Sequence, residues 1–281
     1  MTDRILELFS VPTGQVAVDW NSIIQQQYCP FLSRKCLKIR KSQPERSIGT
    51  CSVSYGVKTQ QKVIICPYRF LERQQIFLDC LHLLTLHEPG NELHKIAEVE
   101  IPGGSVDYFL VSARNHKIVD FVGIELQAVD TTGTIWPERQ QFLRSVGVEV
   151  EQDFDLDKGY GMNWKMTAKT TLVQLHHKVE TFEQLKKHFV LVLQENLLNY
   201  MQREFNFSHI QAARLGDTMH FHAYGLQFDN HEYRLGLASR SSTDAAGITT
   251  ALGLQVSANV ELEVILETLQ RKLSSSNLLI I

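Results

Sequence analysis

The sequence predicts an α/β protein in which a central mixed sheet is flanked by helices. Three segments support this prediction: a helical pattern over residues 68–88, strand-like runs between residues 95 and 129, and a long amphipathic pattern over residues 181–204. Helical patterns on both sides of a strand cluster are typical of layered α/β architectures. A cysteine-rich segment precedes them, so we expect an N-terminal part over residues 1–67 and a core over residues 68–281.

The composition is that of an ordinary globular protein. The chain has 281 residues, of which 43% are hydrophobic and 21% are charged. No apolar run approaches the roughly 20 residues that cross a bilayer. The N-terminal Met1-Thr2-Asp3-Arg4 does not begin a signal peptide, so we expect a cytoplasmic protein without membrane contact. The net charge of −3 argues against indiscriminate nucleic-acid binding but is compatible with a local basic cleft.

Four cysteines lie within one short stretch, spaced C-x6-C-x14-C-x14-C. They are Cys29, Cys36, Cys51 and Cys66. Clustered cysteines in a cytoplasmic protein more often bind metal than form disulfides, although four independent cysteines are the alternative. Four thiolates suit a tetrahedral ion, for which zinc is the default, and leave no open coordination position. We therefore expect a structural metal site that holds this segment together.

The remaining cysteine belongs to the pattern over residues 68–88. Phe70, Ile76, Phe77 and Leu84 recur there at helical spacing, and Cys80 lies on the same apolar face. We expect Cys80 to be a buried helix residue and not a fifth ligand.

Strand patterns follow. Residues 95–101 alternate, Pro102-Gly103-Gly104 predicts a turn, and residues 105–112 and 116–129 are rich in β-branched and apolar side chains.

The second half of the chain begins with the long pattern over residues 181–204, where Thr181 with Gln184 forms a capping box, so we expect one helix. Residues 218–238 predict a hairpin around Asp229-Asn230, and residues 259–273 predict a final helix.

Acidic and amide side chains converge in the strand cluster. Asp107 lies within the second strand run, whereas Glu125 and Gln127 lie two residues apart on the third and therefore share a face. Two carboxylates with a carbonyl oxygen are suitable ligands for Mg²⁺. The alternatives are a solvated sheet face, against which the apolar neighbours Val122, Ile124 and Leu126 argue, and a buried salt bridge.

A further carboxylate is placed by the turn. If Pro102-Gly103 is a two-residue turn, Glu98 pairs opposite Asp107 on the same face, whereas a different loop length would bring Glu100 closer.

Basic and base-reading side chains are candidates for DNA contact. Lys38, Arg40 and Lys41 between two cysteines would bracket phosphates, with Lys165 and Lys169 as weaker candidates, and a solvated surface is the alternative for each. Asn163, Gln174, Arg234 and Arg240 have suitable chemistry for base edges but nothing assigns them.

The histidines do not favour a metal hydrolase site. His220 and His222 share a strand face but lack a third ligand at helpful spacing, so we expect no metal hydrolase site, and we expect His220 to be a packed strand histidine.

Taken together, these residues resemble a known family. Asp-x17-Glu-x-Gln resembles the PD-(D/E)xK nuclease signature, with Gln127 at the position of the usual lysine. Gly123-Ile124-Glu125-Leu126-Gln127, Asp130-Thr131-Thr132-Gly133, the four-cysteine segment and Gly161-Met162-Asn163-Trp164-Lys165 resemble NotI-type restriction endonucleases over roughly residues 28–178.

The resemblance implies a type II restriction endonuclease that hydrolyses double-stranded DNA with Mg²⁺ at a palindromic, G·C-rich site. It implies that Asp107, Glu125 and the Leu126 carbonyl hold Mg²⁺, that Gln127 orients the attacking water, and that the four cysteines hold one iron ion, where spacing alone allows zinc equally. A palindromic site implies a two-fold homodimer. Two further hypotheses are a repair or mobile-element nuclease that nicks DNA and a non-catalytic metal-knuckle DNA-binding protein.

Overall fold

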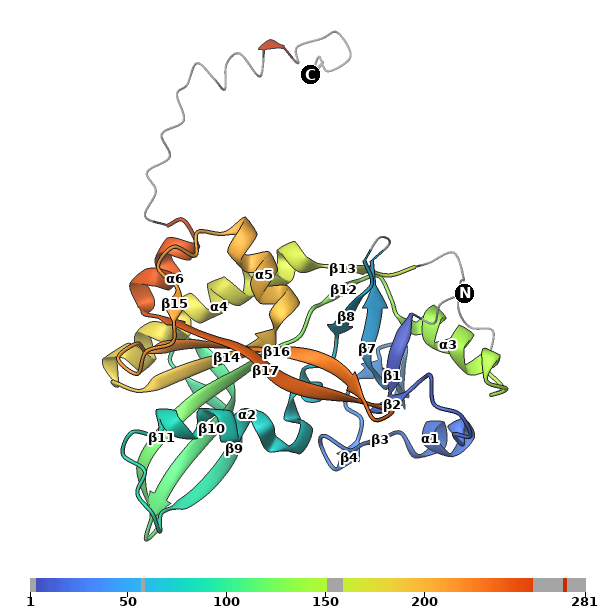
Figure 1. The fold of residues 1–281 in the computed structure, drawn as a ribbon, viewed down its shortest axis with the longest axis horizontal. Helices are drawn as coiled ribbons and strands as arrows, with labels where there is room; N and C mark the ends of the chain where they lie inside the picture. Colours follow the sequence, from blue (N-terminus) through green and yellow to red (C-terminus); the bar gives the residue numbers. More distant parts are fainter. Residues whose placement is uncertain (1–3, 57–58, 151–158, 255–269, 272–281) are drawn as a thin grey trace, which may run out of the picture.

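The protein is built around one seven-stranded mixed sheet (Figure 1). The computed structural model describes residues 4–56, 59–150, 159–254 and 270–271. The strand order is β15-β17-β16-β14-β11-β10-β9, in which β14 pairs in parallel with both β11 and β16 and the other pairs are antiparallel. The strands are β9 Glu92–Ile101, β10 Gly104–Arg114, β11 Lys117–Gln127, β14 His188–Gln194, β15 Gln211–Ala212, β16 Met219–Asp229 and β17 Glu232–Thr243.

Helices cover both faces of this sheet. On one face lie α4 Trp164–Gln184, α5 Glu195–Glu204 and α6 Ala245–Ala251, and on the other lie the 3₁₀ segments η1 Pro67–Gln74 and η2 Leu81–Leu83 with α2 Gln75–Cys80. The alternating side chains of β10, β11 and β14 enter one apolar cluster or the other, because successive side chains of a strand point to opposite faces. The expected mixed sheet flanked by helices is therefore confirmed.

The meander β9–β10–β11 closely follows the prediction. The β9–β10 turn has two residues, because Ile101 pairs with Gly104 across Pro102-Gly103. Gly103 of the turn and Gly104, which begins β10, have positive φ, +97° and +127°, a region that glycine enters without steric cost.

The predicted single helix over residues 181–204 is wrong. Thr181 lies in the last turn of α4, residues 188–194 form the central strand β14, and only residues 195–204 form a helix, α5. β14 is buried on both faces, so its apolar run carries no alternation and cannot be distinguished from a buried helix by periodicity.

The helical pattern over residues 68–88 is also interrupted. Glu72 has extended φ/ψ, and Arg73 and Gln74 have positive φ, so the segment divides into η1, α2 and η2. Cys80 is fully buried at the end of α2, which confirms its expected place on the apolar face.

The predicted hairpin at residues 218–238 is present with its turn shifted by one residue. Asp229 pairs with Glu232, so the turn is Asn230-His231, and both residues have positive φ. The predicted helix over residues 259–273 lies outside the described residues, apart from residues 270–271.

The N-terminal part forms a four-stranded sheet of order β2-β1-β7-β8 beside the end of the central sheet. Val53, Val63 and Ile65 from this part lie in the same apolar cluster as α4 and β14. The division at residue 67 stays a prediction.

The remaining elements are β1 Ile5–Leu8, β2 Val11–Pro12, α1 Trp20–Gln26, β3 Tyr28–Cys29, β4 Arg34–Lys35, β5 Ile39–Arg40, β6 Gln43–Ser47, β7 Thr50–Tyr55, β8 Gln61–Ile64, β12 Thr131–Thr132, α3 Trp136–Ser145 and β13 Gly161–Met162.

Among the described residues, no helix is long and apolar enough to cross a membrane.

Candidate active site

Two carboxylates meet where the start of β10 lies beside the end of β11. Tyr108 pairs with Ile124, and the carboxylate oxygen Oδ2 of Asp107 accepts a hydrogen bond from the Leu126 backbone N–H at 2.8 Å. This hydrogen bond places Asp107 next to Glu125. Both carboxylate side chains are half-buried, so they share a partly desolvated site.

Burial and neighbouring carboxylates raise the pKa values of both carboxyls. For Asp107 the main cause is desolvation, opposed by the Leu126 hydrogen bond and by the charge of Lys178. For Glu125 desolvation comes first and the charge of Asp107 second, opposed by Lys178. Two anions in one partly buried site are stabilised by a nearby cation, which is the electrostatic condition of a divalent-metal site.

Glu98 of β9 lies beside this site, in regular register with β10. Val106 pairs with Val99 and Tyr108 with Ala97, so Asp107 stands opposite Glu98, as expected for a two-residue turn. Glu98 has a φ of +54°, a conformation that non-glycine residues rarely adopt, and its side chain is exposed. Its charge contributes to the raised pKa of Asp107.

Gln127 lies on the same face of β11 as Glu125. Its amide Nε2 donates to the Ala128 backbone oxygen at 2.7 Å. That bond occupies one N–H group of the amide and leaves the carbonyl oxygen to accept from a water molecule.

Lys178 of α4 is part of the site and was not assigned to it by the sequence. Its Nζ donates to Glu125 Oε1 at 2.7 Å, and the residue is only 5% exposed. The missed signal is a lysine on the apolar face of a helix: Leu175, Val179 and Phe182 around it are buried at helical spacing. A lysine on such a face requires a charged partner.

The site fits a divalent cation. Glu125 Oε2 is buried without a hydrogen-bond partner in the structure. An unpaired buried carboxylate oxygen is costly unless a cation or donor reaches it. Within the part of the chain that the structure describes, no three His, Cys, Asp or Glu side chains are grouped to hold a metal ion. A magnesium site here would therefore combine two carboxylates with backbone carbonyl and water oxygens.

The four clustered cysteines are all buried, and none forms a disulfide. Burial raises the pKa of Cys66 to about 11, and the charges of Cys36 and Cys29 raise it further, against the effect of Lys38. Burial, followed by Cys66, raises the pKa of Cys51. The thiols thus lie in one neighbourhood, although no three of these described side chains converge on one point. Cys80 is elsewhere, with its Sγ 3.8 Å from His222 Nδ1.

The basic residues of the cysteine segment have different surroundings. Lys38 Nζ donates to the Ile65 backbone oxygen at 2.7 Å, and burial lowers its pKa. The Arg40 guanidinium lies 4.7 Å from the centre of the Trp136 ring, whereas Lys41 is exposed. Lys165 and Lys169 are exposed on α4.

Lys38 also lines a cavity of about 560 Å³ with Cys66, Tyr68, Asp130 and Asn163, so this cavity joins the cysteine segment to the residues that follow β11.

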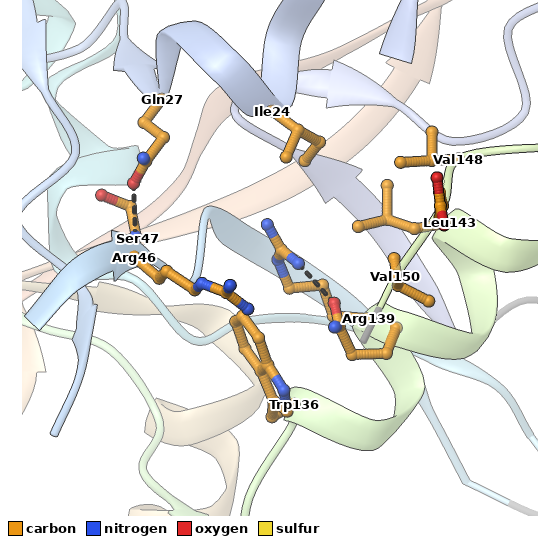
Figure 2. A pocket seen from close by; sticks show the side chains of 11 residues that line it. Ile24, Gln27, Arg46, Ser47, Trp136, Arg139, Leu143, Val148 and Val150 are labelled. Carbon is orange, nitrogen blue, oxygen red and sulfur yellow. Dashed lines mark hydrogen bonds between the residues drawn. The ribbon is translucent and has the colours of Figure 1, made fainter. Parts of the chain in front are cut away.

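A second cavity lies between α1, β6 and α3 (Figure 2). Its volume is about 290 Å³, and Arg46, Trp136 and Arg139 line it. The Arg139 guanidinium lies 4.5 Å from the centre of the Trp136 ring, and the Ser47 backbone N–H donates to Gln27 Oε1 at its edge. The Arg40–Trp136 cation–π contact and the hydrogen bond that Arg139 Nε donates to the Ile48 backbone oxygen at 2.8 Å thus fasten the cysteine segment to α3.

Both strand histidines are buried, which confirms the expected packing of His220. His220 Nε2 lies 2.9 Å from the Asp217 backbone oxygen, and His222 stacks with His82 at 6.1 Å between ring centres. Desolvation lowers the pKa of His220 to about 4 and that of His222 to about 3.

Comparison with known proteins agrees with this geometry. No curated protein matches the chain significantly. The family model described as "Restriction endonuclease NotI" matches residues 23–221, which include the cysteine segment, the carboxylates and α4. The chain therefore belongs to the NotI restriction endonuclease family and is a site-specific deoxyribonuclease.

Proposed function

We propose that this deoxyribonuclease is a type II restriction enzyme that hydrolyses double-stranded DNA at a palindromic, G·C-rich site with Mg²⁺ bound at Asp107 and Glu125. The observation that carries the assignment is the pair itself: Asp107 and Glu125 interact electrostatically, and Glu125 Oε2 is buried without a partner. The Leu126 carbonyl lies between Glu125 and Gln127 in the chain and completes the proposed ligand set with water and phosphate oxygens.

A bound Mg²⁺ would polarise the scissile phosphate and lower the pKa of the attacking water. Asp107 and Glu125 would bind the ion, and Asp107 is held in place by the Leu126 N–H. Gln127 would accept a hydrogen bond from the water through its carbonyl and so orient it. An amide does not titrate usefully, so the proton leaves to bulk water or to the substrate phosphate. Glu98, opposite Asp107, would add negative charge at the rim.

The cysteine segment is proposed to bind one structural iron or zinc ion through Cys29, Cys36, Cys51 and Cys66. The support is chemical: four buried, reduced thiols occupy one neighbourhood. A cation there would offset the cost of forming thiolates in a buried environment.

DNA contact is proposed for the exposed lysines around these sites. Lys41, Lys165 and Lys169 are exposed and can approach phosphates, whereas Lys38 already donates to Ile65 and Arg40 already contacts Gln43 and Trp136, so these two would have to exchange a contact to bind phosphate. A palindromic target would require a two-fold homodimer with one active site for each strand.

The test is incubation of the purified protein with a long unmethylated DNA, with Mg²⁺ or with EDTA. Discrete bands with Mg²⁺ alone support the proposal, and sequencing of the ends gives the site. Nicked circles without linear product would instead indicate a nickase, and intact DNA of reduced mobility would indicate a binding protein; either result would contradict the proposal.

A further inference from the structure

The active site contains a cation that comes from a helix and not from the catalytic strand. Phosphodiester hydrolysis builds negative charge on the phosphate, and a preorganised positive group stabilises that charge. Gln127 is neutral and cannot provide it. Lys178 of α4 is the side chain whose ammonium group contacts a proposed metal ligand, at 2.7 Å from Glu125 Oε1.

The position of Lys178 follows from the way α4 packs along β11. A Cβ at Gly123 would lie 2.3 Å from the Phe182 ring, so Phe182 sits directly on Gly123. Lys178 sits on Glu125. Four residues on a helix rise about 6 Å and two residues on a strand rise about 6.6 Å. Because α4 and β11 run in opposite directions, the spacing from Phe182 to Lys178 matches the spacing from Gly123 to Glu125. The packing of Phe182 on Gly123 therefore places Lys178 beside Glu125.

The β9–β10 turn fixes α4 at this height. Thr181 Oγ1 donates to the Pro102 backbone oxygen at 3.0 Å. A Cβ at Gly103 would lie 2.3 Å from the His177 backbone oxygen, and one at Gly104 would lie 3.5 Å from Lys178 Cε. The turn that sets Glu98 opposite Asp107 thus also packs against α4 on both sides of Lys178.

We propose that Lys178 supplies the cationic side chain of this active site, in place of a lysine at position 127, and donates to the scissile phosphate during hydrolysis. This inference rests on the proposed site at Asp107 and Glu125. One N–H of Lys178 holds Glu125 Oε1 and leaves Oε2 for the metal ion. An ammonium group has three donors, so two remain to stabilise charge on a phosphate oxygen. Lys178 neither gives nor takes a proton in this role.

The experiment removes the positive charge of Lys178 and restores a positive charge at position 127. The variants are Lys178→Met, Lys178→Arg, Gln127→Lys and the double variant Lys178→Met/Gln127→Lys, with Lys117→Met as control, because Lys117 is exposed at the far end of the same strand. Single-turnover cleavage is measured with Mg²⁺, DNA affinity with Ca²⁺, and the melting temperature without metal. Affinity and melting temperature report binding and folding independently of catalysis.

We expect Lys178→Met to lower the single-turnover rate about 100-fold or more with DNA affinity within about threefold of the parent. The double variant should recover at least about tenfold of that loss, and Lys178→Arg should stay within about tenfold of the parent, because each restores a positive charge at the site. Lys117→Met should cleave like the parent.

A Lys178→Met enzyme that cleaves within about threefold of the parent would overturn the inference. If Lys178→Met melts early, Lys178→Arg decides: an inactive Lys178→Arg that melts like the parent would also overturn the inference. Cleavage by Glu125→Ala would defeat the proposed site as a whole, whereas an inactive Glu125→Ala beside an active Lys178→Met would defeat this inference alone.

Discussion

The side-chain amide of Gln194, at the end of β14, pairs with the backbone around Ile64 in β8. Gln194 Oε1 accepts from the Ile64 N–H at 2.8 Å, and Gln194 Nε2 donates to the Lys62 oxygen at 2.6 Å. One buried amide thus satisfies two backbone groups at the edge of β8 and joins the N-terminal sheet to the central sheet.

Replacing Gln194 by Leu should lower the free energy of unfolding by about 1–3 kcal/mol, because the Ile64 N–H would be left buried without an acceptor. Urea denaturation would measure the change. Gln227→Leu, at an exposed position of β16, is the control and should change stability by less than about 0.5 kcal/mol. An unchanged midpoint for Gln194→Leu would show that the amide does not secure β8.

Replacing Gly123 by Ala should destabilise the protein by about 1–3 kcal/mol, because the new methyl group would overlap the Phe182 ring. To relieve this overlap α4 would have to move away from β11, which would also move Lys178 away from Glu125. Cleavage should therefore fall as well. Thermal melting and a cleavage assay measure the two effects. Gly216→Ala meets no atom within 4 Å and should be neutral in both. A fully stable and active Gly123→Ala would contradict the close packing of α4 on β11.

Replacing Glu125 by Ala should abolish cleavage, by about 10³-fold or more, because a proposed metal ligand is lost. Specific DNA binding measured in Ca²⁺ should survive. Lys178 would then be left without its carboxylate partner, so a modest fall in melting temperature is also expected. Undiminished cleavage in Mg²⁺ would remove Glu125 from the active site.

Purified protein should carry about one iron or zinc ion per chain if the four clustered thiols act together. Metal analysis gives the identity of the ion, and a visible absorption band would distinguish coloured iron from colourless zinc. Cys51→Ser should lose the ion and should unfold more readily. Cys80→Ser, outside the cluster, should keep it. Equal metal content in both variants would argue against the four-cysteine site.

Acid should destabilise the protein through His220 and His222. Each has a pKa of 6.5 when unfolded and a lower pKa when folded, about 4 and about 3 respectively, chiefly because burial disfavours the charged ring. Between those values the unfolded chain binds more protons, so stability is complete above pH 6.5 and falls as the pH drops toward the folded pKa values.

The comparison for this effect is His222→Leu. Between pH 7.5 and pH 5 it should lose about 2 kcal/mol less stability than the parent, because one titrating site is gone. His94→Gln, at an exposed position, should behave like the parent. Identical pH profiles for His222→Leu and the parent would show that His222 is already charged or solvated when folded.

The sequence predicted the parts of the structure that depend on local pattern. The Pro102-Gly103 turn, the three strands that follow one another in sequence and the burial of Cys80 follow from short-range chemistry, and the turn and the strand pairing bring Asp107, Glu125 and Glu98 together.

The failures come from elements defined by their tertiary neighbours. β14 is apolar on both faces because helices cover both sides, and the sequence alone reads such a run as part of a helix. Lys178 is distant in the chain from Glu125, and no local rule links a helix lysine to one particular strand carboxylate.

The parallel pairing of β14 affects the order in which the parts of the site fold during synthesis. β9, β10 and β11 pair with their neighbours in sequence, so the acidic half of the site can assemble early in synthesis. Lys178 is made later, and α4 settles only when β14 enters between β11 and the still later β16. If the proposed roles of Asp107, Glu125 and Lys178 hold, a nascent chain emerging from the ribosome would have its carboxylates without their ammonium partner, and nuclease activity would begin only with the last steps of folding.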